Sequence, residues 1–455
     1  MPLLGRIKAL AKRMKGTNIG DIIVGSGVNT IAKVAATGLG FIGSLLIARY
    51  YSADVLGRIA TISSMLSILS LFALLGNHTY ILRTIPQRLE QFGSRNALRV
   101  FFKVATLVLM SVCTVVIAVM IGLKVKPDLF GAVQKFQFLL YGLILVTCLK
   151  KISILALRTL GDYKIFSAFE ILPPLFMMLV VLLSVSLNIN GNQFIYFYYA
   201  PHFALAMLVF YIVMKRFLNR IHTEADVDQK SQLESSHLAQ LPTYPGILKV
   251  AIPMLGVTLS NAVIINTDIL MLSSFTDEQT VGIYSVYVKI AALMGIAIAA
   301  VNSMYAPKAA RLFGSGKVQE LKVLTKRATF LSFSVSCAAL ACILLVHKPL
   351  LSLYGAVFSN HMSAFYILLF SMLCNSYYGS IGMLLNMTGK QNRFFIIMST
   401  AALINAVLNY YLIPEFGPIG AAWATLATVL YWNTLAAITV KTSFGFTTFP
   451  AIRNR

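Results

Sequence analysis

The chain has 455 residues, of which 58% are hydrophobic and only 12% are charged. A soluble globular domain has about 25% charged residues, because charge solvates the surface that faces water. The composition therefore excludes a large water-soluble protein and indicates one whose main solvent is lipid. The formal net charge of +23 would by itself suit a nucleic-acid partner, but the distribution of the charges along the chain excludes that partner.

Twelve apolar segments follow one another along the chain, each close to the roughly 20 residues that an α-helix needs to cross a bilayer. Several of them, including 59–82 and 394–413, contain no Asp, Glu, Lys or Arg. The sequence therefore predicts an all-α integral membrane protein with about 12 transmembrane helices, at 22–48, 59–82, 102–123, 134–157, 167–187, 194–214, 247–272, 282–306, 327–347, 363–387, 394–413 and 418–440.

The basic residues are divided unequally between the two sides of these predicted spans. When basic residues toward the span ends are counted with the adjoining loop, 30 of the 38 Lys and Arg residues fall in the termini and in the loops on their side. Six fall in the opposite loops, and Lys33 and Lys289 lie within spans. Positively charged loops stay in the cytoplasm. We therefore expect a multi-pass membrane protein with both termini cytoplasmic.

One polar segment interrupts the chain near its middle and predicts a division into two lobes. Residues 215–246 contain the run EADVDQKSQLESSH and are expected to form a cytoplasmic linker. The expected order is a basic N-terminus at 1–21, an N-lobe at 22–214, the linker, a C-lobe at 247–440 and a tail at 441–455.

The two predicted lobes repeat short motifs at nearly one spacing. Three pairs of segments match at offsets of 225, 221 and 228 residues: Ser52–Ile59 with Asp277–Tyr284, Pro86–Ser94 with Pro307–Ser315, and Leu157–Phe166 with Leu385–Phe394. In the first pair Gly57 aligns with Gly282, and the second pair shares a proline and the triplet Phe-Gly-Ser. Because each lobe has six spans, both enter the membrane from the same side. A pseudo-twofold axis along the membrane normal should therefore relate them.

Three segments carry a family resemblance: Leu45–Ala60 (LLIARYYSADVLGRIA), Pro86–Glu90 (PQRLE) and Asp268–Ala291 (DILMLSSFTDEQTVGIYSVYVKIA). Over essentially the whole chain, the sequence resembles the multidrug/oligosaccharidyl-lipid/polysaccharide exporter superfamily, in its bacterial O-antigen-type flippase branch. The resemblance implies a twelve-helix, two-lobed transporter for undecaprenyl-pyrophosphate-linked sugars in lipopolysaccharide or other surface polysaccharide biosynthesis. The implied partners are the lipid-linked oligosaccharide and membrane lipids. A coupling ion and other polysaccharide-assembly proteins stay open.

Charged and polar residues inside the spans are the candidate substrate-binding residues, because charge at membrane depth costs at least about 2.5–3.5 kcal/mol and usually faces a cavity or a partner. Lys33 lies in the first predicted span with Asn29 and Thr37 one turn to either side. This polar face suits an anionic headgroup, or alternatively a lysine satisfied by neighbouring groups. Arg83 ends the second span, where a pyrophosphate would enter.

Asp268 and Lys289 lie in consecutive spans joined by a short loop, so their heights in the membrane can match. Two interpretations stay open for them: a structural ion pair, or a contact for the substrate.

We expect no catalytic residue, no cofactor and no metal site. The chain has no ATP-binding P-loop, and its five cysteines lie in predicted spans without the spacing of a metal or disulfide framework: Cys113, Cys148, Cys337, Cys342 and Cys374. Two alternatives to a flippase remain. One is a multidrug or cation antiporter of the same fold, which favours carboxylates in its cavity. The other is a membrane-bound polysaccharide polymerase or ligase, for which the predicted outer loops are too short.

Overall fold

The computed structural model describes residues 18–125, 134–228 and 241–448, and every regular element in these ranges is a helix. The first six long helices form the N-lobe: α2 (Asn18–Tyr50), α3 (Ala53–Leu74), α4 (Asn77–Val125), α6 (Gln137–Thr159), α7 (Tyr163–Ser186) and α8 (Gly191–Asp228). The C-lobe consists of α9 (Tyr244–Phe275), α10 (Glu278–Gly314), α11 (Val318–Tyr354), η2 (Ala356–Ser359), α12 (Met362–Tyr378), α13 (Ile381–Met387), α14 (Gln391–Phe416) and α15 (Pro418–Phe444).

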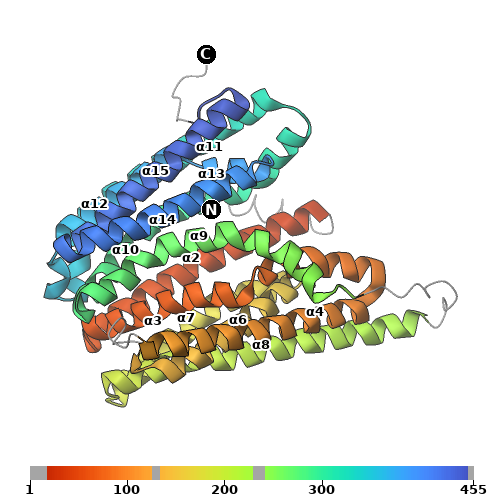
Figure 1. Ribbon diagram of the computed structural model, residues 1–455, viewed down its shortest axis with the longest axis horizontal. Helices are drawn as coiled ribbons and strands as arrows, with labels where there is room; N and C mark the ends of the chain where they lie inside the picture. The colour runs from red at the N-terminus through yellow and green to blue at the C-terminus, as the bar shows by residue number, and fades with distance from the viewer. Residues whose placement is uncertain (1–17, 126–133, 229–240, 449–455) are drawn as a thin grey trace, which may run out of the picture.

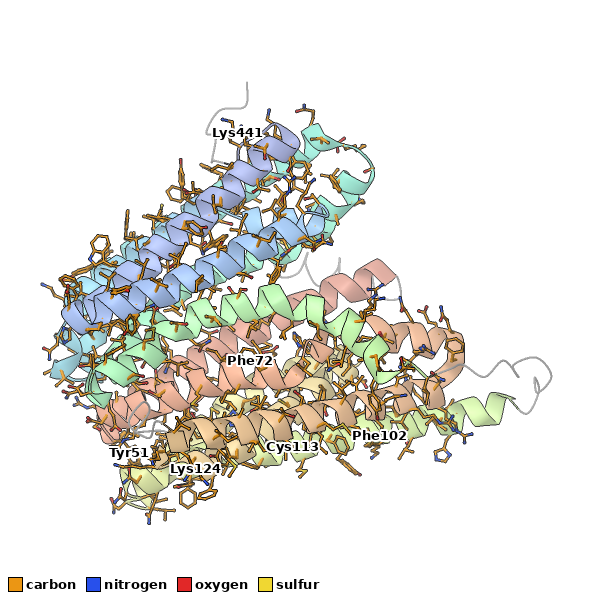
Figure 2. All side chains as sticks on the ribbon, in the orientation of Figure 1. Tyr51, Phe72, Phe102, Cys113, Lys124 and Lys441 are labelled. Carbon is orange, nitrogen blue, oxygen red and sulfur yellow. The ribbon has the colours of Figure 1, made fainter. Side chains whose placement is uncertain are left out.

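The predicted twelve spans are confirmed. Eleven helices in the described ranges are long and apolar enough to cross a membrane, and α12 with α13, bent by 43°, forms one more broken span. Large apolar side chains such as Met110, Ile121 and Met207 are exposed on the outside of the bundle, where lipid would solvate them. Figure 2 shows that side chains cover the helices along their whole length. Tyr51 and Lys124 lie at one end of the bundle and Lys441 lies at the other.

The second predicted span is interrupted, which the sequence analysis did not foresee. Leu75 and Gly76 have φ angles of 48° and 76°, so α3 ends there and α4 begins at Asn77. A Cβ at Gly76 would lie 2.0 Å from the carbonyl oxygen of Ala251, because the backbone of α9 passes directly against this break. The predicted loop after this span is also helical, and Gly93 (φ 73°) turns the chain within α4.

The two lobes pack together at one end and separate toward the other (Figure 1). We call the end with Tyr50, Ala53, Phe275 and Glu278 the outer end, as the charge bias predicts, and the opposite end the inner end. One continuous apolar core contains residues of both lobes, including Leu56 of α3 and Ile283 of α10. A second core lies wholly within the C-lobe, and α9 runs alongside α3 and α4.

The outer contact between the lobes is pseudo-symmetric. A Cβ at Gly57 would lie 1.9 Å from the carbonyl oxygen of Glu278, and one at Gly282 would lie 2.0 Å from that of Ala53. Ala53 and Gly57 pair with Glu278 and Gly282 at the 225-residue offset of the repeat. Only residues without a side chain allow two helices to approach this closely. The contact therefore lies on the pseudo-twofold axis that the sequence repeat predicted.

The third repeat also recurs in the backbone. Gly161 follows α6 with a φ of 82°, and Gly389 follows α13 with a φ of 73°. Both residues therefore adopt the left-handed conformation that ends a helix and favours glycine.

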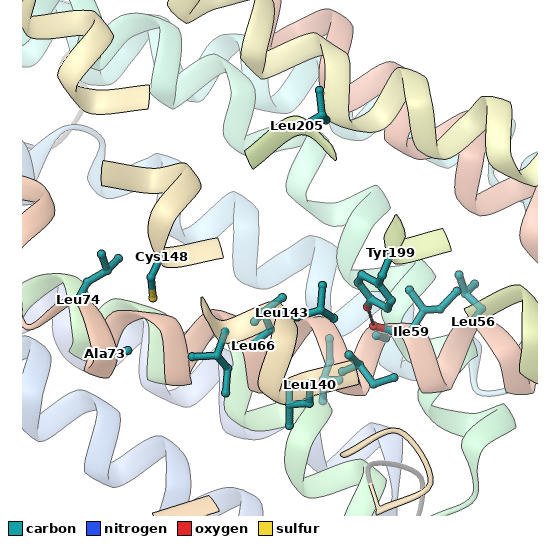
Figure 3. Close-up of a cluster of buried hydrophobic side chains, with 14 of the residues drawn as sticks. Leu56, Ile59, Leu66, Ala73, Leu74, Leu140, Leu143, Cys148, Tyr199 and Leu205 are labelled. Atoms are coloured by element: carbon teal, nitrogen blue, oxygen red, sulfur yellow. Dashed lines mark hydrogen bonds between the residues drawn. The ribbon is translucent and has the colours of Figure 1, made fainter. Parts of the chain in front are cut away.

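The N-lobe core surrounds α3 (Figure 3). Leu66 of α3 packs among Leu140 and Leu143 of α6, all of them buried. The hydroxyl of Tyr199 on α8 donates to the backbone oxygen of Ile59, 3.1 Å away. This core fixes α3, the helix that carries the N-lobe side of the outer contact.

The expected domain boundaries stay predictions. Helix α8 continues to Asp228, fourteen residues beyond the predicted end of the N-lobe, so the first part of the expected linker 215–246 is helical. The expected N-terminus at 1–21 and the remainder of the linker lie largely outside the described residues. Of the expected tail at 441–455, residues 441–448 are described, and α15 continues into it as far as Phe444.

Candidate functional site

An ion pair between the lobes reinforces the outer contact. Arg58 on α3 donates through Nε to Glu278 on α10 at 2.5 Å, and through Nη1 to Asn192 on α8 at 2.6 Å. Glu278 begins α10, where a carboxylate also interacts favourably with the helix dipole. Arg58 therefore ties α3 to the C-lobe rather than reaching toward the membrane interface.

A second link between the lobes at the outer end joins α2 to α11. The hydroxyls of Ser44 and Tyr354 lie 3.0 Å apart, and both residues are buried. Tyr354 also donates to the carbonyl oxygen of Phe41. These contacts and the outer contact keep the lobes together at this end.

Lys289 is exposed at membrane depth. It lies about 16 Å along the helix axis from Glu278, roughly half of a 30 Å hydrocarbon layer. Its side chain is exposed although the seven residues 281–287 just before it are buried. Among the described residues three ion pairs occur, and none includes Lys289. An ammonium group at this depth is stable where water or an anion reaches it.

Lys33 is also exposed, and it lies at the middle of the long helix α2. Its distance from Tyr50 at the outer end is about 26 Å along the axis. The Thr37 hydroxyl donates to the backbone oxygen of Lys33 at 2.8 Å, so Thr37 bonds to the helix and not to the ammonium group. Asn29 belongs to α2, but its side chain lies outside the described residues.

Arg83 is exposed on α4, six residues beyond the helix start at Asn77. Its position past the α3–α4 break places it in the inner half of the N-lobe. Lys33, Lys289 and Arg83 thus lie on three different helices, and their joint role stays a prediction.

Of the two interpretations left open for Asp268 and Lys289, the structural ion pair is wrong. Asp268 is 4% exposed and accepts hydrogen bonds from Tyr284 at 2.7 Å, from the Nδ2 of Asn409 at 2.9 Å, and from Thr425. These donors hold the carboxylate inside the C-lobe, whereas Lys289 is exposed on another face of α10. Two residues at the same depth in the membrane can point in different directions from their helices, and depth was all that the sequence predicted for Asp268 and Lys289.

The surroundings of Asp268 form a C-lobe polar cluster, which consists of Asp268, Tyr284, Asn405, Asn409 and Thr425. The side-chain oxygens of Asn405 and Asn409 are buried there without a hydrogen-bond donor in the described structure. A carboxylate beside two free carboxamide oxygens and hydroxyl groups offers the oxygen donors that a small hard cation prefers. The described residues contain no group of three or more His, Cys, Asp or Glu suited to a metal ion.

Sequence reasoning missed a set of basic residues inside the N-lobe. Lys150 and Lys151 were assigned to an inner loop, yet both lie within α6, and Lys150 is about 13 Å along the axis from its end. Lys151 donates to the hydroxyl of Ser70 on α3 at 2.9 Å. The assignment failed because counting charges places any lysine pair toward the end of a span in the adjoining loop. A warning signal was present, since the helical pattern continues to Arg158.

The family comparison matches part of the C-lobe. Residues 253–411 match the MatE family. A 172-residue segment is 29% identical to the probable flippase AglR of Haloferax volcanii and covers 37% of this chain and 36% of AglR. A 161-residue segment is 24% identical to CapF of Staphylococcus aureus, a capsular polysaccharide biosynthesis protein, and covers 35% of this chain and 41% of CapF. The matches therefore span well under half of the length of either relative.

The fold comparison covers nearly the whole chain. The structure resembles the lipid II flippase MurJ in an inward closed conformation, with a TM-score of 0.68 and 14% identity over 91% of this chain and 87% of MurJ. It also resembles the MATE multidrug transporter DinF-BH, with a TM-score of 0.66 and 16% identity over 94% and 96% of the two chains. The chain therefore shares the fold of these two transporters, and residues 253–411 match the MatE family.

Only some of the polar residues described above lie within residues 253–411, the segment that matches the MatE family. Asp268, Lys289, Asn405 and Asn409 lie within it, whereas Thr425 and all of the N-lobe residues lie outside the matched segment. The shared fold accounts for the arrangement of the lobes but does not determine the role of these polar residues.

Proposed function

We propose that the chain is a flippase that moves an undecaprenyl-pyrophosphate-linked oligosaccharide across the bacterial inner membrane by alternating access, for surface polysaccharide biosynthesis. The exposed ammonium group of Lys289 at membrane depth carries this proposal. It is not balanced by any of the ion pairs in the described residues. A diphosphate that leaves water needs such a cation, since attraction between opposite charges grows as the local dielectric falls.

Lys33 and Arg83 extend the basic character toward the inner end, where the substrate would enter. Both side chains are exposed and belong to helices of the N-lobe. In the proposed path the diphosphate meets Lys33 and Arg83 first and Lys289 deeper in the membrane, while the polyprenyl chain remains in lipid. Asn29 belongs to the same polar face of α2 in the sequence.

The arrangement of the lobes supports alternating access. They share a core and an ion pair at the outer end, and toward the inner end α9 still packs against α3 and α4, whereas other C-lobe helices have a core of their own. Parallel repeats of this kind typically bind their substrate at the interface between the halves and rock about it. Opening of the outer contact would complete the cycle.

The membrane potential favours the proposed direction. When the inside of the membrane is negative, moving one negative charge outward is favourable by about 2.3 kcal/mol per 100 mV. The names of the relatives, a probable flippase and a capsular polysaccharide biosynthesis protein, support the same class of cargo.

The C-lobe polar cluster is our candidate for the site of a coupling ion. Its two free carboxamide oxygens and the carboxylate of Asp268 would bind a sodium ion or a proton, and its members come from α9, α10, α14 and α15. An ion there would hold these four helices together and so bias the conformation of the C-lobe. Coupling is therefore proposed at a site separate from Lys289.

A multidrug antiporter is the second candidate, because DinF-BH shares the fold. Such a transporter would need a carboxylate that an organic cation can reach. Asp268 is enclosed within its lobe and offers no surface to a molecule of that size. The flippase therefore fits the described side chains better.

The test is a deletion of the gene in its native host, followed by analysis of lipid-linked saccharides. We expect these to accumulate and the surface polysaccharide to disappear, and the intact gene to reverse both effects. Lys289→Ala should fail to complement, whereas Lys308→Ala, which changes an exposed lysine at the inner end of the same helix, should complement. Unchanged polysaccharide export in the deletion strain would refute the proposal.

A further inference from the structure

The N-lobe basic cluster, which we define as His78, Lys150, Lys151 and His202, lies where the helices of the N-lobe meet. His78 begins α4, the two lysines are on α6, and His202 is on α8. Consecutive helical residues point about 100° apart, because a turn contains 3.6 residues. One lysine therefore faces α3 and α4 while the other faces α8.

The contacts of the lysines agree with this geometry. The Nζ of Lys151 donates to Ser70 on α3 at 2.9 Å. Lys151 is within electrostatic range of His78 and Cys148, and Lys150 is within electrostatic range of His202. In Figure 3 the Cys148 side chain, one turn before Lys151, points toward α3 near Ala73 and Leu74.

Among the residues that the structure describes, no ion pair balances these charges. The ion pairs in the described part of the chain are Arg58–Glu278, Arg216–Asp162 and Lys317–Glu320, and none involves this cluster. Two ammonium groups within a transmembrane lobe are costly unless an anion compensates them.

The cluster also has unused hydrogen-bonding capacity. Nδ1 of His78, Nδ1 of His202 and the hydroxyl of Thr147, one turn before Lys150 and Lys151 on α6, are buried without a hydrogen-bond partner in the described structure. Each of these groups can donate a proton to an acceptor. A buried donor without a partner costs free energy, so an acceptor that reaches these groups would be stabilised there.

We propose that the N-lobe basic cluster is a binding site for a phosphoryl group. Donors approach it from α4, α6 and α8, which suits a tetrahedral oxyanion, whose oxygens accept hydrogen bonds from several directions. Both lysines and both histidines are partly exposed, so a small ligand can reach them. The phosphoryl group comes either from free phosphate or from the headgroup of an anionic phospholipid. The site lies within one lobe, apart from Lys289, and does not rest on the proposed transport function.

The test uses the full-length protein purified in detergent. We expect the native protein to bind radiolabelled inorganic phosphate saturably in equilibrium dialysis, or to retain about one anionic phospholipid per chain that mass spectrometry detects. The first result assigns the site to free phosphate and the second to a lipid headgroup.

Variants locate the ligand. Lys150→Met and Lys151→Met keep the aliphatic stems and remove the charges, and each should weaken phosphate binding at least tenfold or abolish lipid retention. Lys124→Met, which changes an exposed lysine at the outer end, should bind as the native protein does. Lys150→Arg and Lys151→Arg should retain the ligand, and they keep the test decisive if a methionine variant fails to fold. Absence of both ligands from the native protein, or equal binding by all variants, overturns the proposal.

Discussion

The outer contact offers the sharpest perturbation of the conformational equilibrium, because a single methyl group is enough to disturb it. In Gly57→Ala the new Cβ would lie 1.9 Å from the carbonyl oxygen of Glu278, whereas ordinary van der Waals contact begins at 3.4 Å. The helices α3 and α10 must therefore separate by about 1.5 Å. Overpacking of this kind costs about 1–3 kcal/mol. The outer-closed arrangement should lose about 5- to 150-fold in population relative to one without the contact.

The assay measures access to a buried residue between the lobes. Ser44→Cys, in a background without the five native cysteines, places a thiol where Ser44 meets Tyr354 across the lobes. Reaction with a membrane-impermeant maleimide added from outside should be faster in Gly57→Ala. The matched control is Gly38→Ala, since nothing lies within 4 Å of a Cβ at Gly38. Equal labelling rates in the two variants would show that the close approach does not control the outer end.

Three further outcomes test other contacts. Glu278→Gln breaks the ion pair with Arg58 and should raise Ser44→Cys labelling no more than about fivefold, because partly exposed ion pairs contribute about 1 kcal/mol or less. The charge exchange Arg58→Glu with Glu278→Arg should restore slow labelling. If it does not, the two residues do not act as a pair. Lys289→Arg should retain transport in the deletion strain whereas Lys289→Gln should not, since the charge is the proposed requirement; similar complementation by both would be inconsistent with it. Asp268→Asn turns an amide nitrogen toward one of three donors, so the free energy of unfolding should fall by about 1–3 kcal/mol and thermal unfolding should begin at a lower temperature. Sodium should no longer raise the midpoint temperature of unfolding. A variant with the native midpoint temperature and the native response to sodium would rule out the C-lobe polar cluster as a cation site.

The transmembrane architecture could be predicted from the sequence because lipid imposes a single rule, a long apolar helix, on every span. The repeat carried more information than its weak motifs suggested. The alignment of Gly57 with Gly282 identified the residues that meet on the pseudo-twofold axis. Backbone contact requires glycine at both positions, and this requirement leaves a trace in the sequence.

Directions of side chains could not be predicted in the same way. Asp268 and Lys289 have suitable heights, but the former points into its lobe and the latter does not. The break at Leu75–Gly76 depends on the backbone of α9, which is distant in sequence. Lys150 and Lys151 were counted as loop residues because a charge count takes no account of how far a helix continues.

Reconstitution tests the central proposal most directly. Purified protein in proteoliposomes should move a fluorescent polyprenyl-diphosphate oligosaccharide between leaflets, measured as the fraction that an added glycosidase can reach. We expect transport well above that of protein-free vesicles with the native chain and with Lys308→Ala, and a loss with Lys289→Ala. A native protein that moves no more substrate than empty vesicles, or a Lys289→Ala variant as active as the native protein, would contradict the account.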